Sequence, residues 1–479
     1  MPVPYLHGVE FLPVQTGVRS ISVVRSSVIA LVGTAPKGPL QELILVQKSS
    51  DLAQFGSELP NFTIPQSLNA IFANQPTQVL VVNVFDPAID ITAVALEAVV
   101  IASGKGKTAF CPIGPLTSIY EVDGITVIAA TLGTDYTIDD FGNIVVINHT
   151  LIPDSTIKIN YNAADFTGID GATIIGVDGS PRTGMQLFRE AFSTFGYKPK
   201  QMITPGYSAL TGVEAELASA SARYKAVYYI DAPDDVEVND IITSRGPAGP
   251  IDAFNIADKR GCLLYPMPLA YDAYTNANQR RFFSAYFAGL VAYVDANFGY
   301  HVSPSNNVIA GITGIERPIT FDFTDATGTT DANQLNAAGI ITIANAVGTG
   351  YLAWGNSSSY FPGNTTPDQF LCVQRVRDVV EESIAFAMLP FADKPLSVAQ
   401  ADSIVETVNT FMRQLIGRGA LIDGSNCSLD PEENTTDTLG AGQIFFDLDF
   451  MSPTPGQRFT FKSFLDTSLL KNVLSGIGN

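Results

Sequence analysis

The sequence predicts a multidomain α/β protein with an all-β insertion and a helical C-terminal region that ends in strands. Apolar strands alternate with amphipathic helices along most of the 479 residues, which favours an α/β layer. Between about residues 113 and 169, short strands separated by glycine and aspartate turns replace the helix patterns. From about residue 370, two long helical patterns precede alternating strands.

The N-terminal end predicts an extended arm. Residues 1–22 contain three prolines and two glycines, which disfavour a helix. The run SISVVRSSVIALVG then has the β-branched composition of a strand and ends at Gly33. A second strand (ELILVQ), a short helix and the buried strand QVLVVNVF follow. Residues 23–112 are therefore expected to form an N-terminal α/β part.

Residues 113–169 are interpreted as an inserted domain, because α/β sequence flanks this all-β stretch on both sides. The α/β pattern resumes over residues 170–369, where strands such as KAVYYID alternate with helices. A long helix is expected over Ala277–Asn297. Its uncharged part is shorter than the about 20 residues needed to span a membrane, so we interpret it as a core helix.

Residues 370–479 are expected to form two helices and then strands. The first helix has a valine and isoleucine stripe, and the second begins with a capping box formed by Ser397 and Gln400. The run GQIFFDLDFM alternates apolar and polar residues, as a half-buried strand does. The run RFTFKSFLD follows a proline turn, and residues 453–479 are interpreted as a C-terminal arm.

Composition favours a subunit of an assembly. Charged residues are only 15% of the chain, against about 25% in an ordinary soluble protein, and mean hydropathy is +0.19. A chain that buries much of its surface against other copies tolerates so little charge. The net charge of −20 disfavours binding to a nucleic-acid backbone or an anionic membrane. Four scattered cysteines indicate reduced thiols, and no secretory signal is expected.

No motif points to catalysis, a cofactor or a metal. Gly33 and Gly38 have the spacing of a phosphate-binding loop, but the lysine and hydroxyl residue that must follow are missing. The three histidines are scattered, and there is no G-x-S-x-G motif. Asp447 and Asp449 share one strand face, which we interpret as a solvated or subunit-facing edge. A nucleotide-binding or hydrolytic α/β enzyme is therefore a remote alternative.

Both ends carry strand-like segments that lie outside any expected compact core. A free strand can pair with the sheet edge of another chain through main-chain hydrogen bonds. When each chain donates its strand to a different neighbour, the contact is heterologous and builds rings or helical tubes.

In this order, the segments resemble the tail sheath proteins of contractile-tailed phages over almost the whole chain. The resemblance rests on HGVEF, GVRSISVVRSSVIALVGTAPKGP, FGSELPNFTIPQSLNAIFANQPTQVLVVNV, ITPGYS, YYIDAPDD, AGLVAYVDANFGYHVSPSNNVIAGITGIERP, ANQLNAAGIITI, LAWGNSSS, RVRDVVEESI, VNTFMRQLIGRGALIDG and GQIFFDLDF with PGQRFTF. One departure is Ser357-Ser358 after the Trp-Gly-Asn triplet, where the family commonly has Arg-Thr.

The resemblance implies a subtilisin-like middle domain, an outward-facing insertion and an inner C-terminal sheath domain completed by strands from neighbouring subunits. It implies a non-enzymatic subunit that forms stacked hexameric rings around a tail tube and contracts, driving the tube through the host envelope for genome ejection. A tailocin or an extracellular contractile injection system is the alternative. The type VI secretion sheath is disfavoured because it is built from two shorter chains.

The implied partners are further copies of the chain, the tail tube protein, and the baseplate and tail terminator proteins. Direct nucleic-acid binding, membrane insertion and a cofactor are not expected. The implied location is the virion tail, assembled in the host bacterial cytoplasm. The residues assigned to strand donation are Ile21, Val23 and Val24 near the N-terminus, and Phe459, Phe461 and Leu465 near the C-terminus. The assigned receiving residues are Ile444, Phe446, Leu448 and Phe450.

Overall fold

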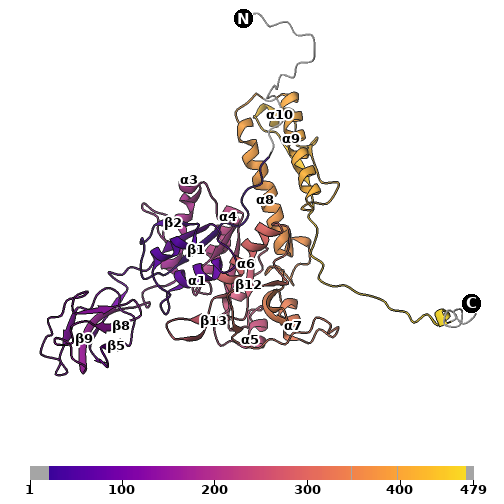
Figure 1. Cartoon of the computed structure of the whole chain (residues 1–479). Helices are drawn as coiled ribbons and strands as arrows, with labels where there is room; N and C mark the ends of the chain where they lie inside the picture. Colours follow the sequence, from indigo (N-terminus) through magenta and orange to yellow (C-terminus); the bar gives the residue numbers. More distant parts are fainter. Residues whose placement is uncertain (1–20, 347, 396, 471–479) are drawn as a thin grey trace, which may run out of the picture.

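The computed structural model describes residues 21–346, 348–395 and 397–470, and within these ranges a nine-stranded sheet forms the centre of the molecule (Figure 1). Neighbouring strands run parallel from β3 to β17, and β2 and β18 flank them antiparallel. The order across the sheet is β15 (Asn307–Val308), β18 (Gly350–Trp354), β17 (Ile340–Ala346), β12 (Gly261–Leu264), β11 (Val227–Asp231), β10 (Gln201–Ile203), β1 (Ile29–Gly33), β3 (Val79–Asn83) and β2 (Leu43–Val46).

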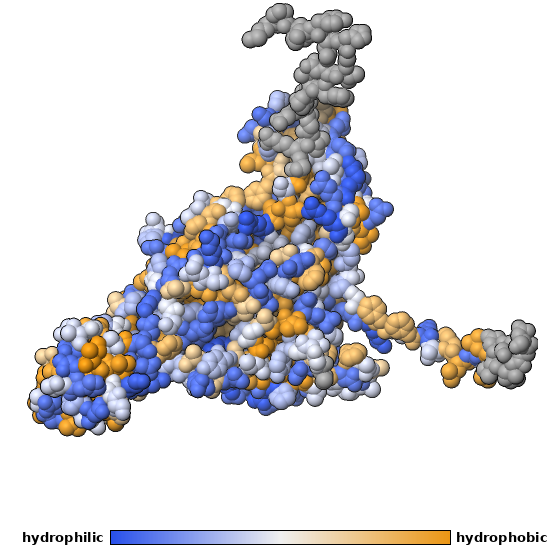
Figure 2. All heavy atoms as spheres, viewed as in Figure 1, coloured by the Kyte–Doolittle hydropathy of each residue, from blue (hydrophilic) through white to orange (hydrophobic). Residues whose placement is uncertain are grey.

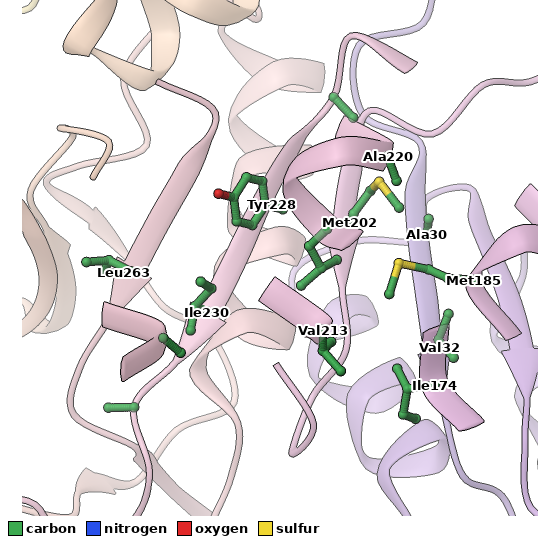
Figure 3. Close-up of a cluster of buried hydrophobic side chains, with 14 of the residues drawn as sticks. Ala30, Val32, Ile174, Met185, Met202, Val213, Ala220, Tyr228, Ile230 and Leu263 are labelled. Atoms are coloured by element: carbon green, nitrogen blue, oxygen red, sulfur yellow. The ribbon is translucent and has the colours of Figure 1, made fainter. Parts of the chain in front are cut away.

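The parallel strands are continuous apolar runs because helices cover both faces of the sheet. All five residues of β1 are buried. Ala30 and Val32 pack into one core, and Ile29 and Leu31 pack into the other. Figure 3 shows the first core, where strand and helix side chains meet: Ala30, Val32, Met202, Ile174 and Val213.

Two sets of helices supply these cores. The first core contains residues of α2 (Gly171–Ile175), the 3-10 helix η2 (Gly184–Glu190), α3 (Ala191–Phe195), α4 (Val213–Tyr224), α5 (Val238–Thr243), η3 (Asp252–Phe254) and α7 (Asp331–Ala337). The second contains residues of η1 (Ser49–Phe55), α1 (Thr63–Phe72) and α6 (Phe283–Asn297). Among the described residues, no helix is both long and apolar enough to cross a bilayer.

The expected core helix begins later than the sequence suggested. Helix α6 starts at Phe283, because Ala277–Arg280 forms strand β14 and pairs with β13 (Pro268–Asp272). Strand β16 (Gly314–Ile315) completes this small sheet. Nearly all of α6 is buried, as predicted. At Gly289 an added Cβ would lie 2.6 Å from the Ile71 carbonyl oxygen, so α1 and α6 approach each other at this glycine.

The all-β stretch forms an inserted domain with a core of its own. Its strands are β4 (Ile91–Val100), β5 (Lys105–Lys107), β6 (Ser118–Tyr120), β7 (Tyr136–Ile138), β8 (Asn143–Val146) and β9 (Thr156–Ala164). They form two sheets, ordered β4-β9-β6 and β5-β8-β7. The β-rich part thus starts at Ile91 rather than at 113, because β4 pairs with β9 along its length.

Contacts that fasten the inserted domain to the body include an aromatic stack, a cation–π contact, an ion pair, and a hydrogen bond from Ser57 Oγ to Asp140 Oδ2 at 3.0 Å. The rings of Phe141 and Tyr274 stack with centroids 6.1 Å apart. Lys107 Nζ lies 4.4 Å from the Tyr274 ring centroid, in cation–π geometry. Lys37 Nζ lies 2.8 Å from Asp140 Oδ2. Figure 1 shows this domain projecting from the body beside the end that carries β1 and β2.

The N-terminal α/β part and the middle segment share one sheet. Strands β1, β2 and β3 come from residues 23–112, and β10, β11, β12 and β17 come from residues 170–369. β1 pairs with both β3 and β10. The two segments therefore build one continuous layer, whereas the sequence predicts two separate parts.

The C-terminal region forms a third core around two long helices. It contains α8 (Leu371–Met388), α9 (Val398–Gly417), the short α10 (Thr436–Gly440), β19 (Asn426–Leu429) and β20 (Phe446–Asp449). The predicted stripes are confirmed: Val376, Val380, Val408 and Phe411 are buried together. Ser397 accepts a hydrogen bond from the backbone N–H of Gln400 and caps α9. The Gln400 side chain donates to the Phe391 carbonyl instead of returning to Ser397, so only half of the predicted capping box forms.

Ion pairs join α8 to the body. The amino ends of β1, β10, β11 and β12 share one edge of the parallel sheet, and the residues just before these strands face α8. We call the following buried contacts the α8 ion pairs: Arg375–Asp295, Arg260–Asp378 and Lys200–Glu382. Since a charge leaves water at large cost unless it is paired, these contacts fix where α8 leaves the body.

Candidate assembly interface

The C-terminal core carries a small sheet with one open edge. Strands β19 and β20 pair antiparallel, with Cys427 opposite Leu448. Within the described ranges, no third strand joins this sheet. An unpaired sheet edge is a template for a strand from another chain.

Asn409 of α9 closes the other edge. Its side-chain amide donates to the Cys427 carbonyl at 2.9 Å, and its carbonyl accepts from the Cys427 N–H at 2.7 Å. The backbone groups of Cys427 therefore point away from β20. In an antiparallel pair, when the backbone groups of one residue point away from the partner strand, those of the directly opposite residue do the same. Leu448 lies opposite Cys427, so its N–H and C=O point away from β19 and face the open edge. The free edge belongs to β20.

The side chains of β20 alternate as the sequence predicted. Phe446, Leu448 and Phe450 are half-buried against the third core. Asp447 and Asp449 lie on the exposed face. Partial desolvation and the nearby charges of Asp430 and Asp449 raise the pKa of the Asp447 carboxyl. Ile444 is half-buried and precedes the strand by two residues.

The C-terminal arm leaves the body as an extended apolar segment. Gln457 Nε2 donates to Asn356 Oδ1 at 2.7 Å, which is the side-chain hydrogen bond that ties the start of the arm to the body. Beyond it, Phe459, Phe461 and Leu465 are 78%, 92% and 101% exposed. Figures 1 and 2 show the arm running away from the rest of the chain, with apolar residues along it. Aromatic side chains exposed to this degree are costly in an isolated chain.

The N-terminal donor residues lie elsewhere. Ile21 is buried in the third core of its own chain, and Val23 packs against the same core. The Val24 N–H donates to Ser383 Oγ of α8 at 3.1 Å. Residues 21–26 form no regular strand. Residues 1–20 of the expected arm lie outside the described residues.

The features tested for enzyme chemistry have structural roles. A Cβ on Gly33 would lie 2.2 Å from Thr63 Oγ1, so this glycine allows α1 to approach β1. His149 is exposed in the inserted domain, and burial lowers the pKa of the half-buried His301. The cysteines are free, and all but the half-buried Cys111 are buried. Among the described residues, no group of three or more potential ligands is arranged to hold a metal ion.

Sequence reasoning missed one buried carboxylate. Asp231 ends β11 and accepts hydrogen bonds from Ser284 N at 2.6 Å and Ser284 Oγ at 2.5 Å, so it caps the start of α6. Burial raises its pKa to about 6, while the hydrogen bonds from Ser284 oppose the shift. The aspartate at the end of the buried strand KAVYYID was the signal available in the sequence.

Two solved sheath structures share the fold of this chain. The sheath complex of the extracellular contractile injection system PVC, in the contracted state, matches with a TM-score of 0.59 and 14% identity, over 98% of this chain and 99% of that one. The helical sheath of the anti-feeding prophage in the contracted state matches with a TM-score of 0.59 and 14% identity, over 97% of this chain and 100% of that one. The chain therefore has the fold of these sheath proteins.

Sequence comparison gives the family. The phage tail sheath protein central domain matches residues 181–359. The tail sheath protein of Burkholderia phage BcepMu is 36% identical over 99% of this chain and 100% of that protein. The tail sheath protein of Escherichia phage P2 is 27% identical over 62% of this chain and 71% of that protein. The chain belongs to the phage tail sheath protein family, which confirms the predicted resemblance, and it is a structural subunit of a contractile sheath.

Proposed function

We propose that the chain polymerises as stacked hexameric rings around a tail tube, and that contraction drives the tube through the host envelope for genome ejection. Membership of the phage tail sheath family supports this role. The observation that carries polymerisation is the apolar C-terminal arm, which leaves its own body while β20 keeps an open edge. The chain thus has both a donor strand and an acceptor edge.

The arm and β20 are complementary in pattern. Phe459, Phe461 and Leu465 would lie on one face of an extended arm, and Phe446, Leu448 and Phe450 form the apolar face of the receiving edge. An arm seated on β20 of a second copy would cover its own phenylalanines and extend the third core. Because each copy gives to one neighbour and receives from another, the contact repeats along a ring or helix.

The N-terminal arm, residues 1–22, is proposed as a second donor. Ile21, Val23 and Val24 would then act mainly as its anchor, since they lie against the third core and α8 of their own chain. An arm anchored at α8 starts beside the sheet that would receive strands.

We further propose the domain roles that the family resemblance implies. Residues 170–369 would be the subtilisin-like middle domain, supported by a parallel sheet with helices on both faces. Residues 113–169, extended to include β4 and β5, would form an outward insertion of sandwich type. Residues 370–479 would face the tube, with the arm from about 453. The proposed role involves no catalysis and no cofactor.

The proposed surroundings follow from the same role. The partners would be further copies of the chain, the tail tube, and the baseplate and tail terminator proteins, within a virion tail assembled in the bacterial cytoplasm. The sheath of a tailocin or an extracellular injection system is the second candidate, because the solved sheaths with this fold come from such systems. The 36% identity to a phage protein over the full chain favours the phage tail.

Electron microscopy of the purified chain tests arm exchange. Wild-type protein should form hollow striated tubes, alone or on added tail tubes, and the variant Phe459→Ser/Phe461→Ser should stay monomeric. Phe323→Ser is the matched control, because Phe323 is equally exposed but lies on the body. Tubes formed by the arm variant as readily as by wild type would refute the proposal.

A further inference from the structure

The exposed face of β20 carries negative charge that nothing in the described part of the chain neutralises. Asp447 and Asp449 lie on this face, and Asp430 is close enough to repel Asp447. No ion pair within the described ranges involves any of the three. Like charges crowded on a strand destabilise it unless a cation faces them.

The arm carries the opposite charge on the matching face. In an extended strand, alternate residues share a face, so Phe459 and Phe461 lie on one side and Arg458, Thr460 and Lys462 on the other. All of these residues are exposed, and neither Arg458 nor Lys462 forms an ion pair within the described part of the chain. Between Arg458 and Lys462 the arm is therefore apolar on one face and doubly positive on the other, and Phe464 and Asp466 follow on the basic face.

Two alignments, which differ by a slip of two residues, satisfy both faces. When Phe461 lies opposite Leu448, the phenylalanines cover the apolar face of β20. Lys462 then lies opposite Asp447 if the strands are antiparallel, or opposite Asp449 if they are parallel. In both directions Thr460 faces the other aspartate, and Arg458 reaches that aspartate diagonally. When Phe459 lies opposite Leu448 instead, Arg458 lies opposite one aspartate, Thr460 faces the other, and Lys462 reaches that other aspartate diagonally.

We propose that Arg458 and Lys462 of the arm bind Asp447 and Asp449 on β20 of a second copy, and that this charge match restricts the register of the exchanged strand to these two alignments. The inference rests on the proposed arm exchange and adds the groups that specify it. Apolar contact alone leaves the register open to slips of two or four residues in either direction, because every even slip keeps Phe459 and Phe461 on the apolar side. Slips beyond the two alignments leave only one of Arg458 and Lys462 beside the aspartates. A slip of one residue would place phenylalanines beside carboxylates.

Charge reversal tests the register. The arm variant Arg458→Glu/Lys462→Glu and the edge variant Asp447→Lys/Asp449→Lys should each raise the protein concentration needed for tube formation about tenfold or more. The variant that combines all four substitutions restores opposite charge and should assemble within about threefold of wild type. All substituted residues are exposed, so each monomer should unfold at the wild-type midpoint.

The outcomes separate this inference from the proposed function. If the reversal variants assemble like wild type while Phe459→Ser/Phe461→Ser does not, arm exchange stands and the charge register is wrong. If the phenylalanine variant also assembles, arm exchange itself fails. A four-residue variant no better than either reversal would likewise refute the direct pairing. Leu448→Cys combined with Phe461→Cys, or with Phe459→Cys, should give a disulfide between copies in at least one of the two variants. Formed tubes without a cross-link in either variant would refute the register.

Discussion

Replacing Asp295 with asparagine removes the negative partner of Arg375 at the junction between α8 and the body. The Arg375 and Asp295 side chains are only 5% and 2% exposed. Arg375 donates to Asp295 Oδ1 at 2.8 Å and to the Ser26 carbonyl at 2.9 Å. Burial acts to lower the pKa of Arg375, but the Asp295 carboxylate outweighs burial and keeps this pKa above its ordinary value. The guanidinium therefore stays charged in the variant and loses its counter-charge.

The expected loss is about 3 kcal/mol in the free energy of unfolding. Breaking a buried ion pair from one side costs about 3–5 kcal/mol, because the remaining charge is left without a partner. The lower end applies here, since asparagine keeps one acceptor oxygen and Ser26 still accepts from Arg375. At about 2 °C per kcal/mol for a large domain, the unfolding midpoint should fall by about 6 °C.

Scanning calorimetry of purified monomer measures this effect, with Glu406→Gln as the control. Arg413 and Glu406 also form an ion pair, but both side chains are largely exposed. Exposed pairs contribute at most about 1 kcal/mol, so the control should shift the midpoint by no more than about 2 °C. Equal shifts for Asp295→Asn and Glu406→Gln would refute the assigned role of the buried pair. Replacing both members by Asp295→Leu/Arg375→Met should recover part of the loss, since no charge is then stranded.

Three further outcomes are expected. Because burial raises the folded-state pKa of Asp231 to about 6 from the ordinary 3.8, its contribution to stability is full below pH 3.8 and is lost as pH rises through 6. Between about pH 4.5 and about pH 7.5, the free energy of unfolding of Asp231→Asn should therefore rise by about 2 kcal/mol relative to that of wild type, as measured by denaturation at both pH values. A difference that stays constant with pH would contradict the assigned burial. Gly289→Ala should lower the free energy of unfolding by about 1–3 kcal/mol, because the added methyl group forces α1 away from α6. Gly417→Ala is the control and should be neutral or slightly stabilising, since the space around its Cβ is open. Similar unfolding midpoints for the two variants would contradict the close approach of α1 and α6. Tyr274→Ala should release the inserted domain from the body without unfolding the body. The release should be measured as faster proteolysis of the segments that connect the two. An unchanged cleavage rate would show that the stack with Phe141 does not hold the domain.

Local patterns identified the elements whose partners lie close in sequence or whose whole surface is buried. The stripe in α8, the capped start of α9 and the alternation in β20 follow from one segment each, because side-chain periodicity belongs to the segment itself. The buried helix α6 was recognisable for the same reason, although its first turn was misplaced. Ala277–Arg280 has no strong strand signal, and only its pairing with β13 makes it a strand.

Features that depend on distant partners could not be predicted. Strand β4 was assigned to the α/β part because its partner β9 begins more than fifty residues later. The α8 ion pairs join residues 80 to 182 positions apart, and no local spacing marks Arg375 or Lys200 as buried. Ile21 belongs to a core formed by residues beyond Val376, so its packing depends on the folded C-terminal region.

The sequence by itself therefore determined the class of protein, the all-β insertion, the helical C-terminal region and the apolar alternation of both the arm and β20. These properties are carried by composition and by short periodic runs, which act before any distant contact forms. The tertiary structure decided which strands share the nine-stranded sheet, where α8 leaves the body, and that β20 rather than β19 offers the open edge. The location of the open edge depends on Asn409, whose side chain pairs with the backbone groups of Cys427 and so closes the β19 edge. Asn409 reaches Cys427 only after α9 has packed beside β19, which is a contact between two elements of the fold rather than within one.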